Sequence, residues 1–316
     1  MKIKIILLLI AIVILLSACA SVSQYTDFFS SGSSSGSGKG FMVSFTQAPE
    51  SGSKLSQFDT FSVVLDLSNY MVSQDPVFAK VCLSDSTSDS YSGIPSNECR
   101  EVTVSQAEQV NKNFFPGKEQ IRFPSQGFYK YEKLDRLSVD NQIFANVFYK
   151  AKTEAGSIAC VSIPNLKNAP KNCIGQSRLN VQQQESPLKV SNILVTPNAI
   201  GENEVKLNIE ITLSKERDTE VYKPSNSLGS VNSQNEGARI EVTTRSSSTI
   251  DPVSCRGVSQ NIIDFKKDQN EKVIKCSTSI RLSQEFDNIP IIIDLEYQVH
   301  KIIEGPKFTL KREEET

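Results

Sequence analysis

Alternation of apolar and polar residues is the main pattern of this chain from residue 41 onward. Apolar side chains occupy every second position in two long runs, 205–213 and 291–299. Shorter runs of the same kind occur at 41–45, 61–67 and 143–149. A period of two gives a strand one apolar face for a core and one face for water. Because no regular order of strand and long helix is present, the pattern predicts an all-β fold with antiparallel sheets.

A polar break at residues 182–187 divides these runs into two groups. We place a domain boundary there, which gives domain 1 at residues 41–186 and domain 2 at residues 187–316. Each domain is expected to be an antiparallel β-sandwich, because short strands alternate with turn-rich loops in both. One short helix is expected from Ser105, because Ser105 and Glu108 have the spacing of a capping box.

The first 40 residues have a different character. A basic start precedes 12 apolar residues at 5–16, and the small residues Ser17 and Ala18 follow before Cys19. This is the layout of an export signal, and the apolar run is shorter than the roughly 20 residues that a membrane-spanning helix needs. We therefore assign residues 1–18 to a signal peptide. Residues 19–40, which are rich in Ser and Gly, are assigned to a flexible linker.

Residues 16–19, Leu-Ser-Ala-Cys, resemble the lipobox of prokaryotic lipoproteins. The resemblance implies that Cys19 is lipidated and becomes the first mature residue. The mature protein would then be anchored in a cell membrane or outer envelope and face the extracytoplasmic side. Ordinary secretion remains an alternative, because Ala18-Cys19-Ala20 also fits an A-x-A cleavage site.

Six cysteines remain after Cys19, and an even number in an exported chain indicates disulfides. Six cysteines allow 15 pairings, which sequence alone cannot distinguish. They fall into three couples that are close in sequence, and we expect the bonds Cys82–Cys99, Cys160–Cys173 and Cys255–Cys276. A metal site is not expected, because the chain has no C-x-x-C motif and a single histidine.

Composition narrows the classes of function. The formal net charge is −2 with no clustered basic face, so nucleic acid is not an expected partner. Any Ser-His-Asp or Cys-His site would have to use His300, because it is the only histidine. His300 directly follows the alternating run that ends at Val299, so we expect an exposed or strand-end side chain without a catalytic role. The sequence therefore predicts no enzyme, no cofactor and no metal.

Residues 51–69 resemble the opening of immunoglobulin-like modules on prokaryotic, particularly archaeal, surface proteins. The resemblance implies a surface-exposed, non-catalytic module. We therefore expect a structural, adhesive or protein-binding role, with an envelope or surface protein as partner. The polar loops at 84–98 and 214–237 are the expected contact surfaces, and the first should tolerate shortening without loss of stability. A solute- or polymer-binding lipoprotein associated with transport and a histidine-independent hydrolase remain as alternatives.

Overall fold

The protein is an all-β structure. The computed structural model describes residues 40–71, 76–87, 90–96, 98–110, 113–132, 134–163, 173, 175–183, 186–229, 236–246, 249–266 and 268–312. These residues form 22 β-strands and no α-helix, and every strand pair except β2 with β22 is antiparallel. The expected fold class, all-β with antiparallel sheets, is thereby confirmed. The signal peptide, Cys19 and residues 20–39 of the linker lie outside the described residues.

A ten-stranded sheet extends through the whole body. Its main path has the order β18 (Thr249–Pro252), β17 (Gly237–Ser246), β22 (Phe286–Lys311), β11 (Ser138–Ser162), β5 (Val77–Asp85) and β6 (Glu98–Val104). Four short strands pair with it off this path: β2 (Lys54–Ser56), β13 (Gln182–Gln183), β16 (Glu220–Tyr222) and β20 (Ile262–Asp264).

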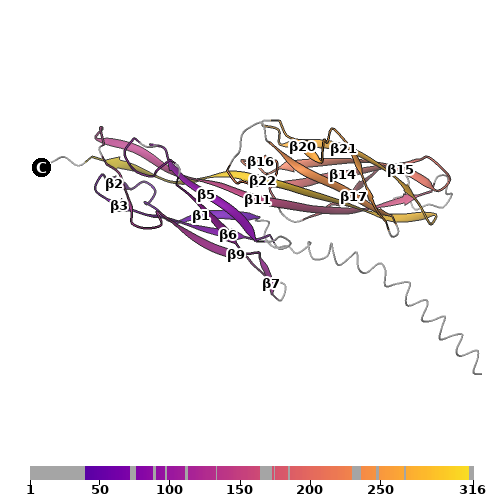
Figure 1. Cartoon of the computed structure of the whole chain (residues 1–316), viewed down its shortest axis with the longest axis horizontal. Coiled ribbons are helices and arrows are strands. Elements are labelled where there is room, and N and C mark those ends of the chain that lie inside the picture. Colours follow the sequence, from indigo (N-terminus) through magenta and orange to yellow (C-terminus); the bar gives the residue numbers. More distant parts are fainter. Residues whose placement is uncertain are drawn as a thin grey trace, which may run out of the picture.

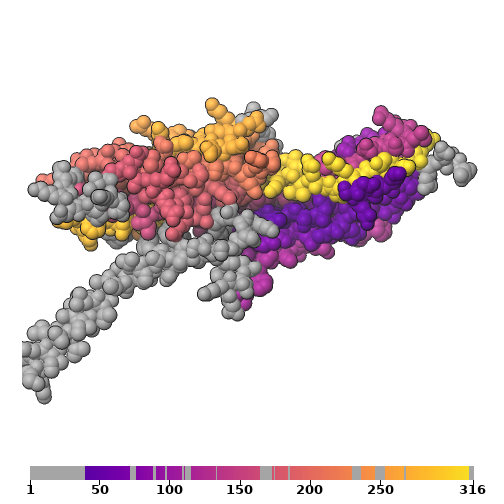
Figure 2. All heavy atoms as spheres, turned by 180° about the vertical axis from the view of Figure 1, so that it is seen from behind, coloured from indigo at the N-terminus to yellow at the C-terminus, as the bar shows by residue number. Residues whose placement is uncertain are grey.

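Two very long strands connect the two ends of the molecule. Strands β11 and β22 pair from Ser138 opposite Lys311 to Ser162 opposite Phe286. Figure 1 shows two lobes lying end to end, with β11 and β22 running through both. The first lobe contains β1 to β10, and the second contains β12 to β21. Figure 2 shows the C-terminal part of β22, in yellow, lying along the indigo N-terminal strands, in agreement with its parallel pairing to β2.

The second lobe has two packed layers. Its second layer is a five-stranded sheet in the order β12 (Ser177–Leu179), β14 (Leu188–Ala199), β15 (Glu204–Lys215), β21 (Glu271–Arg281) and β19 (Ser254–Arg256). The alternating apolar residues of β15 are buried, as are those of β22 from Ile289 to Val299. Tyr297 of β22 also reaches β14, where its hydroxyl accepts a hydrogen bond from Leu188 N at 3.2 Å.

The first lobe is built in a similar way around a three-stranded sheet. This sheet has the order β1 (Phe41–Gln47), β4 (Val63–Asn69) and β9 (Gly117–Phe123). The Phe41 ring of β1 lies 4.7 Å from the Tyr149 ring of β11, so this layer packs against the ten-stranded sheet. Two small sheets complete the lobe: β3 (Thr60–Phe61) with β10 (Tyr129–Lys130), and β7 (Glu108–Val110) with β8 (Asn113–Phe115). The buried apolar side chains of both lobes form one continuous cluster.

Two local expectations differ from the structure. The boundary at residue 187 does not separate two hydrogen-bonded units, because β11 from one side of it pairs along its length with β22 from the other. The helix expected from Ser105 is absent: residues 105–107 have no regular secondary structure and Glu108 begins β7. The Ser105 carbonyl accepts a hydrogen bond from the fully buried Asn69 side chain at 3.0 Å. This long-range bond fixes Ser105 in place of the local capping box.

Three disulfide bonds connect neighbouring strands and loops. They join Cys82 to Cys99, Cys160 to Cys173 and Cys255 to Cys276, which are the local pairs expected from the sequence. The first and third join residues that lie directly opposite each other, in β5 with β6 and in β19 with β21. These two bonds therefore cross-link adjacent strands at the edges of two sheets.

Candidate functional site

The outer face of the ten-stranded sheet carries a group of interacting polar side chains. The inward side chains of β22 are buried from Ile289 to Val299, so alternate residues of the strand point outward, among them Glu296, Gln298 and His300. A segment at residues 216–229 crosses this face after β15. It is held there by β16, which pairs with β22, and by Gln298 Nε2, which donates to Ser225 O at 2.9 Å.

Two depressions lie on either side of this crossing point. One is a groove of about 930 Å³ that contains His300, and we call it the His300 groove. The other is a pocket of about 390 Å³ near Glu296, and we call it the lobe-junction pocket. The crossing segment lines both depressions, with Arg217 to Glu220 and Tyr222 in the groove and Pro224 to Asn226 in the pocket.

His300 is the centre of the groove. Its Nδ1 lies 2.7 Å from Glu220 Oε2, and its Nε2 lies 3.3 Å from Asn146 Oδ1. The imidazole also stacks on the Phe148 ring, with 4.4 Å between centroids and 6° between planes. Both partner atoms are oxygens, so each ring nitrogen that carries hydrogen donates to one of them. The side chain is only 13% exposed, and the expectation of an exposed or strand-end histidine is wrong, because β22 continues to Lys311.

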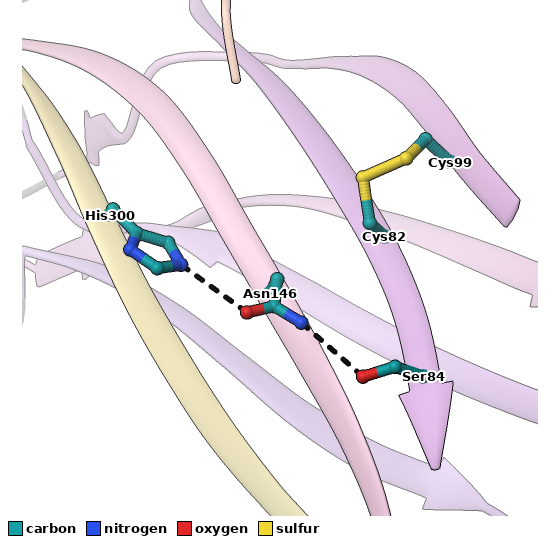
Figure 3. The surroundings of a disulfide bond; sticks show 5 residues. All are labelled: Cys82, Ser84, Cys99, Asn146 and His300. Atoms are coloured by element: carbon teal, nitrogen blue, oxygen red, sulfur yellow. Dashed lines mark hydrogen bonds between the residues drawn. A yellow bond between two sulfur atoms is a disulfide. The ribbon is translucent and has the colours of Figure 1, made fainter. Parts of the chain in front are cut away.

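The polar row continues from His300 across two more strands. Asn146 of β11 donates through Nδ2 to Ser84 Oγ of β5 at 3.4 Å, next to the Cys82–Cys99 bond. Figure 3 shows His300, Asn146 and Ser84 in this order on three neighbouring strands. Asn146 has no titratable proton and separates the serine from the histidine. The row therefore lacks the direct serine–histidine contact that a nucleophilic triad requires.

Burial and hydrogen bonding shift the pKa values of two side chains in the groove. Burial opposes ionisation of Glu220, but hydrogen bonds from His300 and Tyr222, together with electrostatic attraction to His300 and Lys215, hold the pKa of Glu220 below its usual value. Burial, together with the Glu220 carboxylate, raises the pKa of Tyr222. Lys215 and Glu236 form a buried ion pair with 3.8 Å between Nζ and Oε2. Overall the lining contains two cations, Lys215 and Arg217, and five carboxylates, Asp218, Glu220, Glu236, Asp268 and Glu304.

The two loops expected to make contacts have different roles. The 214–237 loop contributes β16 and the crossing segment, and its residues 230–235 lie outside the described residues. The 84–98 loop is anchored in the first lobe, because Ile94 is fully buried and Asp85 accepts a hydrogen bond from the buried Tyr131 hydroxyl. These contacts argue against the expectation that this loop can be shortened without loss of stability.

The partners of His300 were not predicted from the sequence. Glu220 and Asn146 are 80 and 154 residues away from it in sequence, and only the sheet order brings them together. One signal was present: Phe144 and Phe148 occupy polar positions of an alternating strand whose inward residues run from Ile143 to Tyr149. Aromatic residues on the outer face of a strand indicate a surface that another segment or a partner covers.

Two further observations concern the described part of the chain. Among the described residues, no group of three or more His, Cys, Asp or Glu side chains could hold a metal ion. Among the same residues, no helix has the length and apolar character needed to cross a membrane. No protein-family model matches the chain, and a search of curated proteins finds no match.

Proposed function

We propose that the protein is a lipid-anchored cell-surface or envelope protein that works by contact with a protein partner and not by catalysis. The arrangement of His300 carries this proposal. Both of its ring nitrogens have partners within the fold, its ring is stacked on Phe148, and Ser84 does not touch it. A side chain held in this way positions the groove lining. Each lobe has two packed layers, so we also propose that both are immunoglobulin-like sandwiches.

The charge of the His300 groove indicates what kind of surface it fits. Carboxylates outnumber cations in its lining, and Lys215 is already paired with Glu236. The exposed side chain of Ile302 lies among these charges and offers an apolar contact point. Charge complementarity then favours a cationic segment of an envelope or surface protein. The groove lies on the long sheet shared by both lobes, a rigid support for recognition.

Replacement of the lipidated residue tests the anchor. Cys19→Ala is expected to move the protein from the membrane fraction to the medium or the soluble fraction, or to block its processing, because the acyl chains can no longer be attached. Fractionation followed by immunoblotting measures this. Cys19→Ala protein that is processed normally and stays with the membrane would contradict the anchor.

A matched pair of exposed isoleucines tests the groove. A photo-crosslinking amino acid at Ile302, 54% exposed in the groove, is expected to give a discrete protein adduct in intact envelopes. The same substitution at Ile158, 46% exposed on the second lobe, is expected to give none. Gel shifts and mass spectrometry identify the adduct, and adducts of equal yield at both positions would contradict a specific groove.

Ser84→Ala separates contact from chemistry at the same site. The variant removes the one hydroxyl of the polar row. Of the three strands that carry this row, Ser84 lies on the one farthest from His300. Capture at Ile302 and the cellular phenotype are both expected to persist. A variant that keeps the adduct but loses the phenotype would indicate a hydrolase.

A further inference from the structure

The lobe-junction pocket is a second candidate site with a different chemistry. It is lined by strands of both lobes: Val77 and Phe78 of β5, Lys150 to Lys152 of β11, Arg239 of β17, and Glu296 and Tyr297 of β22. The crossing segment closes one side of it with Pro224. Its volume of about 390 Å³ lies in the range of small-molecule sites.

The strand register concentrates positive charge in this pocket. Arg239 and Lys152 lie on either side of Glu296 in one row across three strands. Arg239 Nη1 is 3.3 Å from Glu296 Oε2, and Lys152 Nζ is 3.5 Å from Glu296 Oε1. One carboxylate is thus shared by two cations. Lys150, in the next row, has no ion-pair partner among the described residues, and the lining carries three cations and one carboxylate.

Apolar side chains form the rest of the pocket. Phe78 is 39% exposed and lines the pocket together with Pro76 and Pro224. The floor contains the buried Ala151 and Tyr297. A ligand would therefore meet positive charge on one side and an apolar wall on the other.

A row of carboxylates limits the size of an anionic ligand. Glu154, Asp294 and Glu241 lie opposite one another on β11, β22 and β17, two residues further along the strands from the Glu296 row. Burial, together with these neighbouring carboxylates, raises the pKa of Asp294 to about 6. A long polyanion that followed the strands would meet this acidic row. The acidic row therefore bounds the positive charge on this side of the pocket.

From these features we infer that the lobe-junction pocket binds a small organic acid, with its carboxylate at Lys150, Lys152 and Arg239 and its apolar body against Phe78. Charge-assisted hydrogen bonds to the carboxylate would orient the ligand, and the apolar wall would contribute burial. This inference does not depend on the proposed contact function, because no residue lining the pocket lines the His300 groove.

The absence of tryptophan from the chain provides a direct test. In the full-length protein, Phe78→Trp places a single indole at the pocket wall. Titration with 3-phenylpropionate is expected to give a saturable change in its fluorescence, whereas 3-phenylpropylamine and acetate give none at equal concentrations. Calorimetric titration of the unaltered protein with 3-phenylpropionate is expected to give the same affinity, which guards against a perturbation by the indole.

A charge variant and a matched control complete the test. Lys150→Gln is expected to weaken 3-phenylpropionate binding about fivefold. Lys118→Gln, on β9 of the first lobe and outside the pocket lining, is expected to leave it unchanged. Equal binding of the acid and the amine, or equal affinities of the Lys150→Gln and unaltered proteins, would overturn the inference.

Discussion

Cutting the chain at residue 187 is expected to leave neither half folded. The half that ends there keeps β11 but loses the part of β22 that supplies the buried Phe308 and Leu310 to the first lobe. The other half keeps β22 but loses β11, its hydrogen-bond partner along the strand. Each buried large apolar side chain contributes about 1.5–3 kcal/mol, and each backbone hydrogen bond about 1 kcal/mol. A loss of this size exceeds the stability of about 5–15 kcal/mol that a domain possesses.

Urea unfolding followed by circular dichroism measures this effect. Residues 40–316 together are expected to unfold in one cooperative transition, because the apolar core is continuous between the lobes. Residues 40–186 and 187–316, produced separately, are expected to show no cooperative transition. A sharp transition in either half alone would mean that its own core is sufficient and that the long strands are dispensable.

The long strands also show where sequence reading succeeds and where it stops. The runs at 205–213 and 291–299 predicted strands, and they lie within β15 and β22. The continuation of β22 to Lys311 was not predicted, because its apolar phase changes. Odd-numbered residues up to Val299 are buried in the second lobe, whereas the even-numbered Phe308 and Leu310 are buried in the first.

An irregularity in the strand pairing explains this change of phase. Gln142 pairs with Lys307 but Phe144 pairs with Glu304, so β22 has one extra residue at this point. Such a bulge reverses which side chains of a strand point inward. In the sequence a reversal of this kind is indistinguishable from the end of a strand. The strand was therefore expected to end near Val299, and its continuation into the first lobe was not predicted.

Contacts between residues close in sequence were predicted, whereas contacts between residues far apart in sequence were not. The disulfides join residues that are 13 to 21 positions apart, a separation at which closeness in sequence is informative. The His300 groove depends on the order of β16, β22, β11 and β5 in space. No alternation or motif specifies that order. The candidate site could therefore not be assembled from the sequence.

Loss of one buried hydroxyl is expected to destabilise the first lobe by about 2 kcal/mol. The Tyr131 hydroxyl donates to Asp85 Oδ2 at 2.6 Å and accepts from Asn141 Nδ2 at 2.8 Å, and all three side chains are buried. Tyr131→Phe keeps the ring, which is stacked on Phe61 with 5.4 Å between centroids. It removes the hydroxyl that donates to Asp85 and accepts from Asn141, and loss of a hydrogen bond between buried polar groups costs about 1–3 kcal/mol. Urea unfolding at pH 7 measures the loss.

The pH dependence identifies the hydroxyl as the cause. Burial and the Asp85 carboxylate raise the pKa of Tyr131 above its ordinary value of 10.0. An acid whose pKa is raised by folding stabilises the fold below its unfolded pKa and loses that contribution as the pH rises further. The stability difference between the unaltered protein and Tyr131→Phe should therefore be constant at neutral pH and decrease above about pH 10.

An exposed hydrogen bond with the same donor–acceptor distance provides the control. The Tyr91 hydroxyl donates to Asp135 Oδ1 at 2.6 Å in a solvent-exposed pair. Tyr91→Phe is expected to change stability little, because water replaces the lost partner. Equal losses in the two variants would show that burial is not the cause and that Asp85 does not anchor the 84–98 loop. A loss confined to Tyr131→Phe would mean that this loop is part of the folded core, so that recognition falls to the outer face of the ten-stranded sheet.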